Sequence, residues 1–448
     1  MNCKNSKAKS EKDNVIVCKF GGTSMADRLA VDQVKKIINQ DKSRKFIVVS
    51  APGKTSDSKK VTDLLIDCFH EIESTGKCDQ AFGKVVKRFF DIYGEIIESD
   101  ELLLNVKGQM EENAGYDFCV SRGEYLSAYF FAKEIGYEFI DATELIRFYK
   151  YDGYNETQTE KNCRKRLKEI DCAVIPGFYG ADENGTVRVF SRGGSDITGS
   201  IIAGAIKADL YENWTDVNGI LNADPRVISK AKVLKEMTFA ELRELSYLGA
   251  AVMHPDAIEP LVKHQVSMKV KNTFAANENG TLICPVVKDE VGQQNIVTGI
   301  AGKKDFLVLF IHKTGLNVQK NVIRKILSIL EYYGIPFEHM PSSIDAVNFY
   351  IAKASFPEEL QKTIVSEIRK KIKAEDVRIL KNMALVSVVG RNMASRVGVA
   401  VKIFDTLAAN NINVRMILQG CREINLIIGI DENKYETAIK CLYNSLLK

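Results

Sequence analysis

The sequence gives no sign of a membrane span, a nucleic acid partner or a zinc site. It has no run of about 18 apolar residues, so we expect no helix to cross a membrane. Its net charge of +4 is small for 448 residues, which argues against nucleic acid as a partner. Its 10 cysteines show neither C-x-x-C spacing nor histidine partners, a pattern typical of free thiols in a reducing compartment. We therefore expect a cytoplasmic protein.

The length and composition are those of a globular protein with more than one domain. A chain of 448 residues is too long for one hydrophobic core, so two or three domains are expected. Apolar residues make up 45% and charged residues 27%, which places the chain with ordinary globular proteins. Residues 1–14 are polar and rich in lysine, and we expect a disordered lead-in there rather than a signal peptide.

The most informative stretch is residues 15–24. An apolar run at 15–18 predicts a buried strand, and Lys19 follows it directly. Gly21 and Gly22 allow a tight turn, and the two hydroxyls at 23–24 are expected to cap a helix that begins near residue 25. A lysine beside a glycine turn and a helix N-terminus suits a phosphate. The alternative is an ordinary strand–turn–helix with a surface lysine.

Further apolar strands alternate with helical segments along the first 215 residues. Strands are predicted at 45–50, 139–140, 172–176 and 209–214. This alternation favours a parallel sheet between helices, with ligands bound beyond the carboxyl ends of the strands. The Gly-Lys-Thr at 53–55 resembles the end of a P-loop, but Val48 stands where that motif needs glycine, and we reject it.

Two later clusters carry polar groups suited to a site. In Ser191-Arg192-Gly193-Gly194-Ser195-Asp196, the arginine can bind a carboxylate through two parallel hydrogen bonds, and the aspartate can orient Lys19. The alternative is a helix N-cap formed by Ser195 or Asp196. Residues 215–226 combine a carboxylate, an Asn-Gly turn and an arginine, which could line a nucleotide pocket but alone predict only a loop.

Together these motifs resemble the aspartate kinase family. The resemblance rests on KFGGTS at 19–24, SRGE at 121–124, SRGGSD at 191–196 and TDVNGILNADPR at 215–226, in family order. It implies an α/β fold with an amino-acid-kinase-like, mostly parallel sheet between helices, followed by two ferredoxin-like βαββαβ (ACT) modules. It also implies the reaction, in which ATP phosphorylates the β-carboxylate of L-aspartate to 4-phospho-L-aspartate, the first step of lysine, threonine, methionine and diaminopimelate synthesis.

The resemblance assigns roles to individual residues. It implies catalytic roles for Lys19 and Asp196, substrate binding by Thr62, Glu124, Arg192 and Ser195, and nucleotide binding by Gly21, Gly22, Thr23, Ser24, Thr215, Asp216, Arg226 and Lys271. Mg²⁺ is expected on the ATP phosphates, with few direct protein ligands. Leu221 replaces a nucleotide-contacting tyrosine of some members and Phe274 replaces a lysine, for which Lys271 could substitute. The choice between Thr55 and Thr62 stays open.

The remainder of the chain, from about residue 296, predicts two βαββαβ units of about 70 residues each. The resemblance identifies them as ACT domains, with the first inserted into the second. The expected domains are therefore a catalytic domain at 15–295, a first ACT domain at 313–382, and a second ACT domain made of 297–312 and 383–448. The alternative is a plain dimerisation domain.

Lysine is the expected allosteric inhibitor, bound at a dimer interface of the first ACT domain. The predicted site comprises Leu316, Val318, Asn321, Val322, Ile323 and Glu338. The helix start would bind the effector's carboxylate, and Glu338 its side-chain ammonium, which threonine lacks. We expect a homodimer formed through the ACT domains, or a dimer of dimers. The alternatives are an acetylglutamate or glutamate 5-kinase and a non-catalytic amino-acid sensor; a fused homoserine dehydrogenase is not expected, because the chain shows no G-x-G-x-x-G.

Overall fold

The computed structural model describes residues 14–98, 101–112, 115–150, 153–191, 193–249, 253–287, 296–394, 396–420 and 422–448. The chain divides into two compact units. The first unit comprises Met1–Ile220, Val233–Phe239 and Val252–Lys288, and the second comprises Leu221–Lys232, Ala240–Ala251 and Asp289–Lys448. Two segments that we expected in the catalytic domain therefore cluster with the C-terminal unit. No helix of the described ranges has the length and apolar character to span a membrane.

The first unit contains an eight-stranded sheet in the order β3-β4-β2-β1-β7-β9-β10-β8. The strands are β1 (Ile16–Phe20), β2 (Arg44–Val49), β3 (Glu138–Phe139), β4 (Ala173–Pro176), β7 (Leu210–Thr215), β8 (Glu236–Thr238), β9 (Met268–Asn272) and β10 (Thr281–Cys284). Neighbouring strands pair in parallel, apart from β9 with β10. A two-stranded hairpin, β5 (Tyr179–Ala181) with β6 (Val187–Val189), follows β4. The expected mostly parallel sheet is confirmed.

Helices cover this sheet on both faces. They are α1 (Arg28–Gln40), α2 (Val61–Thr75), α3 (Asp79–Tyr93), α4 (Glu95–Glu98), α5 (Leu102–Glu112), α6 (Tyr116–Ile135), α7 (Ala142–Leu145), α8 (Glu156–Leu167), α9 (Gly194–Ile206) and α11 (Glu259–His264), with short 3₁₀ turns η1 (Gly22–Met25), η2 (Pro255–Ala257) and η3 (Thr273–Ala275). One large apolar core joins α1, α2, α3 and α6 to the face of β1 that carries Cys18 and Phe20. Because side chains alternate along a strand, Lys19 points to the opposite face, where α9 packs.

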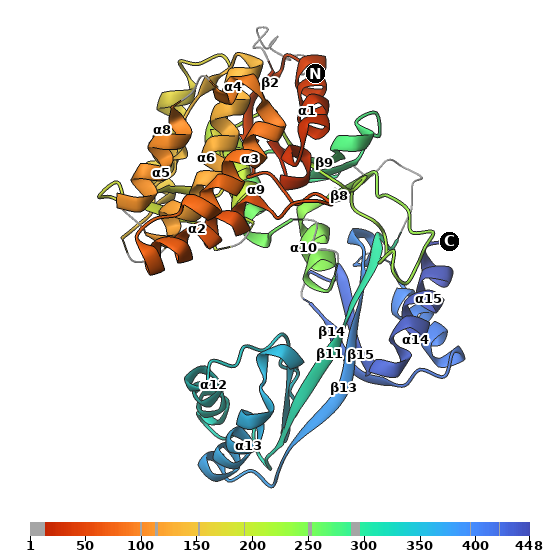
Figure 1. Ribbon diagram of the computed structural model, residues 1–448. Coiled ribbons are helices and arrows are strands. Elements are labelled where there is room, and N and C mark those ends of the chain that lie inside the picture. The colour runs from red at the N-terminus through yellow and green to blue at the C-terminus, as the bar shows by residue number, and fades with distance from the viewer. Residues whose placement is uncertain are drawn as a thin grey trace, which may run out of the picture. The chain divides into compact units, whose positions relative to one another are not determined.

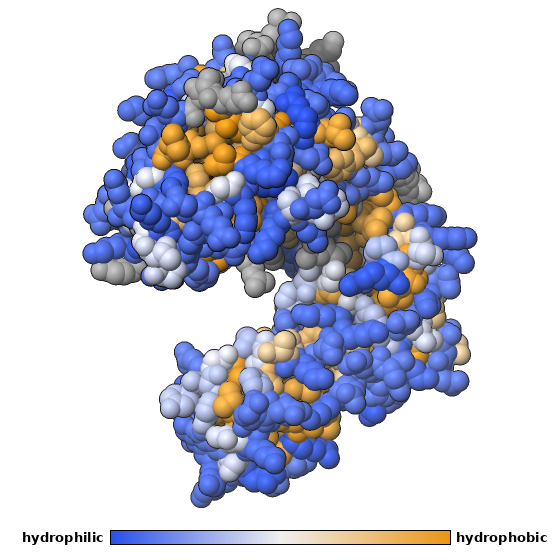
Figure 2. All heavy atoms as spheres, viewed as in Figure 1, coloured by the Kyte–Doolittle hydropathy of each residue, from blue (hydrophilic) through white to orange (hydrophobic). Residues whose placement is uncertain are grey.

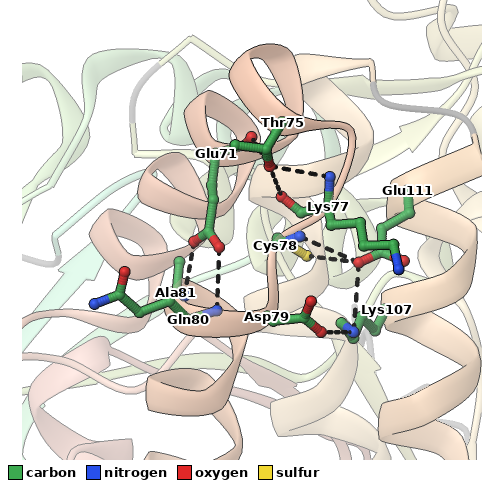
Figure 3. Close-up of polar contacts among 9 residues, drawn as sticks. All are labelled: Glu71, Thr75, Lys77, Cys78, Asp79, Gln80, Ala81, Lys107 and Glu111. Carbon is green, nitrogen blue, oxygen red and sulfur yellow. Dashed lines mark hydrogen bonds and ion pairs between the residues drawn. The ribbon is translucent and has the colours of Figure 1, made fainter.

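Charged side chains complete the N-terminus of α3, which no side chain of its own N-cap residue satisfies (Figure 3). Glu71 of α2 accepts hydrogen bonds from the backbone N–H groups of Gln80 (3.1 Å) and Ala81 (2.8 Å). Glu111 of α5 accepts one from the backbone of Cys78 at 3.1 Å. Two carboxylates at a helix start complement its free N–H groups and its dipole, so they tie α2, α3 and α5 together.

A buried ion pair fixes the central strands beneath the site. Glu212 of β7 accepts hydrogen bonds from Arg44 Nε of β2 at 2.8 Å and from Trp214 Nε1 at 2.9 Å. The Cys18 thiol of β1 lies 3.5 Å from the same carboxylate, and burial raises its pKa well above the ordinary value. A buried carboxylate with several donors is fully compensated, and here it joins three adjacent strands.

The second unit is built on an antiparallel sheet in the order β12-β11-β13-β15-β14. Its elements are α10 (Phe239–Tyr247), β11 (Gly299–His312), α12 (Val322–Tyr332), β12 (Ala346–Ala352), η4 (Lys353–Ser355), α13 (Glu358–Ile372), β13 (Asp376–Val389), η5 (Arg391–Met393), α14 (Val399–Ala409), β14 (Val414–Gln419), β15 (Asn425–Asp431), η6 (Glu432–Lys434) and α15 (Tyr435–Leu446). Figure 1 shows α12 and α13 at one end of this sheet and α14 and α15 at the other. The two expected ACT-like modules are confirmed, and the structure adds that they share one sheet.

The two modules have separate cores, and β11 contributes to both. Ile300 packs in the core with α14 and α15, whereas Leu307 and Leu309 pack in the core with α12 and α13. The β11–β13 register shifts between Lys303 and Phe306, close to the change of core. The predicted domain limits stay a prediction, and this packing suggests a boundary inside β11.

Helix α10 packs within the second unit although it lies early in the chain. Its Glu241 is fully buried and accepts hydrogen bonds from the Thr298 hydroxyl at 2.5 Å and from the Arg391 backbone at 3.2 Å. The Tyr247 hydroxyl at its other end donates to the Glu338 carboxylate. The α10 contacts therefore connect both modules to one helix.

The outer surface in view is mostly hydrophilic, with an apolar patch on the first unit (Figure 2).

Candidate functional site

The turns after β1 and β2 form the floor of the candidate site. The Gly21 N–H donates to Trp214 O at 3.1 Å, and the Gly53 N–H donates to Gly22 O at 2.8 Å. A Cβ on Gly53 would lie 2.8 Å from the Gly22 carbonyl carbon, so the two backbones could not approach with a side chain there. Because of this close approach, the carboxyl ends of β1 and β2 lie side by side at the candidate site.

Lys19 stands at that place and pairs with Asp196. Its Nζ lies 2.7 Å from Asp196 Oδ1, and only 9% of the Lys19 side chain and 15% of the Asp196 side chain are exposed. Asp196 lies in the first turn of α9, where the N-cap is Gly193 at φ 62° without a side-chain cap. The alternative prediction, a helix cap made by Ser195 or Asp196, is therefore wrong. The carboxylate is used for the lysine instead.

The helix after β1 also starts differently from our expectation. Thr23 and Ser24 lie in the 3₁₀ turn η1 and do not cap α1. Asp27 is the cap, and its Oδ1 accepts from the Ala30 N–H at 2.9 Å. The extra 3₁₀ turn delays the helix by a few residues and leaves the Thr23 hydroxyl free to face Asp216, whose Oδ2 is 3.4 Å away. The predicted cap by Thr23 and Ser24 is therefore wrong, and the nucleotide-binding roles of these two residues stay predictions.

Glu124 is a buried carboxylate on α6, the helix that packs against the turn after β2. The SRGE segment at 121–124 lies inside α6, where Gly123 allows close packing on Ala51. Glu124 is 5% exposed, and its Oε2 has no hydrogen-bond partner within the described ranges. Burial raises the pKa of this carboxyl to about 7, against the lowering effect of a backbone hydrogen bond from Ala51. An incompletely paired buried carboxylate is poised for a cationic ligand.

Two hydroxyls lie close to the same floor. Thr62 Oγ1, in the first turn of α2, is buried without a hydrogen-bond partner among the residues described, whereas Thr55 is paired with Ser58 at 2.8 Å. This difference favours Thr62 over Thr55 as the hydroxyl that is available to bind a substrate. Ser195 is in contact with the end of β4, because a Cβ on Gly177 would lie 2.6 Å from its Oγ. The carboxyl ends of β1, β2 and β4 thus meet the starts of α2 and α9.

The predicted nucleotide side gathers at the ends of β1, β7 and β9. Thr215 ends β7, the strand next to β1, and its Oγ1 lies 3.2 Å from Oδ1 of the following residue, Asp216. Asn272 at the end of β9 donates to Asn218 Oδ1 at 2.6 Å, which fixes the turn after β7. Ser24 is fully buried and its hydroxyl shares a 2.7 Å hydrogen bond with Thr273, so its contribution is to hold the glycine turn in place.

The site described in the first unit does not include three predicted ligands. Arg192 lies outside the described residues. Arg226 belongs to the second unit, where its Nη2 pairs with Asp224 Oδ2 at 2.7 Å. Lys271 is in register with Trp214 on β7 and lies over its indole ring at 4.7 Å, so it is on the opposite face of the sheet from Lys19. Burial lowers the Lys271 pKa. The roles of these three residues stay predictions.

Sequence reasoning missed Arg88. This side chain of α3 is 7% exposed, and its Nη2 donates to Ala26 O at 2.9 Å and to Gly53 O at 2.8 Å. It therefore clamps the turn after β1 to the turn after β2. The sequence signal was an arginine on the apolar face of a helix, which alone does not identify its backbone partners.

The predicted effector residues divide into core and surface positions. Leu316 and Val322 are buried in the core of the module with α12, so only their backbones are available to a ligand. Val318 is 75% exposed. Asn321 precedes α12 at φ 67°, and its side chain does not cap the helix. Ile323 is half-buried beside the same core.

Comparison with known proteins defines the class of the chain. A family model described as the amino acid kinase family matches residues 14–272, and a model described as an ACT domain matches residues 386–446. With the parallel sheet, the Lys19–Asp196 pair and the antiparallel C-terminal sheet, these matches define an amino-acid kinase that carries ACT modules.

Individual relatives narrow the class to one family. Aspartokinase 3 of Bacillus subtilis (strain 168) is 34% identical over 445 residues, which cover 95% of this chain and 97% of that protein. The crystal structure of Clostridium acetobutylicum aspartate kinase is 43% identical with a TM-score of 0.88, covering 97% of this chain and 100% of that one. Escherichia coli aspartokinase III, solved with aspartate and ADP and also with lysine and aspartate, is 25% identical with TM-scores of 0.75 and 0.76 and the same coverage. This chain belongs to the aspartate kinase family and is a kinase.

Proposed function

We propose that the chain transfers the γ-phosphoryl group of ATP to the β-carboxylate of L-aspartate, as the first step of lysine, threonine and methionine synthesis. The observation that carries this proposal is the buried Lys19–Asp196 pair, which lies at the strand ends that also receive Glu124. A cation for the phosphoryl group and a buried carboxylate for an ammonium fit an amino-acid substrate.

The reaction needs alignment and charge neutralisation more than proton transfer. The β-carboxylate of aspartate is ionised near neutral pH and attacks phosphorus directly, so no general base is required. Lys19 would neutralise charge on the transferring phosphoryl group, because its ammonium stands beside the Gly21-Gly22 turn. Asp196 would hold the lysine in place through their 2.7 Å ion pair. Neither residue has to change protonation state.

Substrate binding follows from charge matching. Glu124 would bind the α-ammonium of aspartate, which would supply the donor that its Oε2 lacks among the described residues. Arg192 would hold the α-carboxylate through two parallel hydrogen bonds. Thr62 and Ser195 would add hydroxyl contacts, and the unpaired Thr62 Oγ1 supports its part.

The nucleotide would lie over the ends of β1 and β7. The Gly21–Ser24 turn would receive the phosphates, and Thr215 and Asp216 would bind the nucleoside side, with Arg226 and Lys271 as further predicted contacts. Mg²⁺ is proposed to arrive with ATP and to neutralise its phosphate oxygens. No group of three or more His, Cys, Asp and Glu side chains at metal-binding distance occurs in the described part of the chain.

Lysine is the proposed feedback inhibitor, and its complex with E. coli aspartokinase III supports this choice. The loop before α12 bonds to the loop before β12, since the Asn317 N–H donates to Ile344 O at 3.1 Å. Val318 and Ile344 expose apolar side chains there, 75% and 67% accessible, as expected where a second copy packs. We therefore propose a cytoplasmic homodimer formed through the ACT modules. Glu338 would bind the lysine side chain in competition with Tyr247.

A coupled ADP-release assay tests the proposed reaction. Aspartate, glutamate and N-acetylglutamate are offered in turn with MgATP, with and without lysine. Of the three acceptors, we expect only aspartate to be turned over, and we expect lysine to inhibit that turnover. Turnover with N-acetylglutamate or glutamate and none with aspartate would overturn the substrate, whereas inhibition by threonine but not lysine would overturn only the effector.

A further inference from the structure

Asn213 is a buried amide that faces the Lys19–Asp196 pair. It lies on β7 directly opposite Lys19 in the parallel β1–β7 register, so both side chains leave the same face of the sheet. Asn213 is 1% exposed, and its Nδ2 donates to Asp196 Oδ1 at 3.2 Å. The same carboxylate oxygen receives Lys19 Nζ at 2.7 Å. One oxygen therefore links an ammonium and an amide from two adjacent strands.

The chemistry of the partners fixes the orientation of this amide. An ionised carboxylate only accepts hydrogen bonds, so the NH₂ end of Asn213 has to face Asp196. The Oδ1 end then points away and has no hydrogen-bond partner in the part of the molecule described. An apolar side chain would avoid the cost of a buried unpaired oxygen, so the amide is not explained by packing stability.

A second contact ties Asp196 to the same strand. The Tyr211 hydroxyl, two residues before Asn213 on the same face of β7, donates to the Asp196 backbone oxygen at 3.4 Å. Asp196 is thus held by its backbone and by its carboxylate, and both contacts come from β7. Of the two, only the Asn213 contact determines where the carboxylate points.

We propose that Asn213 is a positioning residue for phosphoryl transfer: it fixes the Asp196 carboxylate, and through it Lys19, without adding charge. This inference rests on the proposed role of Lys19. A neutral amide on β7 adds no second negative charge to that of Asp196 on α9, so the positive charge of Lys19 remains available to the phosphoryl group. A carboxylate at position 213 would instead place two negative charges beside one ammonium and draw it away from the substrate.

Two variants and one control separate positioning from general packing. Asn213→Leu keeps the volume and removes the hydrogen bond, and we expect kcat to fall about tenfold while KM for ATP and aspartate changes less than threefold. Asn213→Asp keeps the shape and adds charge, and we expect kcat at pH 8 to fall at least a hundredfold. Ser200→Ala, which removes a hydroxyl bond to Ile197 O on the same helix α9, should keep the wild-type kcat.

The pH profile gives the readout that a structural role would not change. Groups facing position 213 are Lys19, Asp196 and the Tyr211 hydroxyl, and two adjacent carboxylates share a proton more readily as pH falls. We therefore expect the Asn213→Asp kcat, divided by the wild-type kcat at saturating substrates, to rise at least fivefold from pH 8 to pH 6.

A kcat of Asn213→Asp within threefold of wild type, or a loss that is equal at both pH values, would overturn the proposal. Thermal melting shows whether Asn213→Leu folds, and if it does not, the isosteric Asp variant decides. Wild-type enzyme that fails to phosphorylate aspartate would refute the proposed function instead, so the two failures are distinguishable.

Discussion

Aspartate binding should depend on pH through Glu124. Burial raises the pKa of this carboxyl from 4.5 to about 7, and only its ionised form can pair with the substrate ammonium. At pH 8 about ten-elevenths of the ligand-free enzyme is ionised at this position, and at pH 6 about one-eleventh. If only the ionised form binds aspartate, KM for aspartate should rise about tenfold between pH 8 and pH 6.

The assay is steady-state ADP release at fixed saturating MgATP, with aspartate varied at half-unit pH intervals. Glu124→Gln should bind aspartate weakly and lose the pH dependence, because its amide does not ionise in this range. Glu73→Gln, on the exposed surface of α2, is the matched control and should keep the wild-type profile. A flat KM profile in the wild type, or an unchanged profile in Glu124→Gln, would refute the reasoning.

The same pKa shift predicts that the stability of the ligand-free fold decreases as pH rises, whereas aspartate binding improves. A carboxyl whose folded pKa is raised stabilises the fold fully below pH 4.5, and this contribution is lost as pH rises through about 7. The ionised group therefore costs the ligand-free fold about 3 kcal/mol at pH 8. Glu124→Gln should raise the melting temperature at pH 8 while it weakens binding, which separates a lost ligand from a damaged fold.

Three further predictions concern other parts of the molecule. Gly177→Ala should lower kcat/KM for aspartate at least tenfold in the ADP-release assay, because its Cβ would lie 2.6 Å from Ser195 Oγ; activity within threefold would show that this loop yields freely. Calorimetry should show that Glu338→Ala weakens lysine binding. Tyr247→Phe should strengthen lysine binding, because it frees the Glu338 carboxylate. A wild-type affinity for lysine in both variants would exclude this carboxylate as a ligand. Glu71→Ala should cost about 1 kcal/mol in urea unfolding by exposing the α3 N-terminus, with kcat unchanged, and an unchanged midpoint would contradict the capping role.

The parts of the site that are local in sequence could be predicted from the sequence. A β-branched run that leads into Lys19 and two glycines specifies a strand and a turn through neighbouring residues alone. The predicted mostly parallel sheet and paired ACT modules are confirmed for the same reason, because strand and helix periods repeat along the chain. Local signals failed at helix starts, where Asp27 replaced Thr23 and Ser24 as the cap after an extra 3₁₀ turn.

The parts that depend on strand register could not be predicted. Asn213 meets Lys19 only because β1 and β7 pair in parallel, across 194 positions of sequence. Lys271 is one residue out of phase with that face, and a shift of one residue moves a side chain to the other side of a sheet. Arg88 reaches Gly53 only after α3 has packed on the core. Tertiary pairing, and not composition or spacing, decides each of these contacts.

The central claim is that Lys19 acts on the transferring phosphoryl group, and rapid-quench single turnover tests it most directly. Enzyme saturated with labelled ATP and aspartate is quenched on the millisecond scale, for the wild type and for Lys19→Ala, and aspartyl phosphate is quantified. We expect the transfer rate to fall at least about a hundredfold, with dissociation constants for ATP and aspartate changed less than threefold. A transfer rate within threefold of wild type, in a variant that melts as a folded protein, would contradict the account.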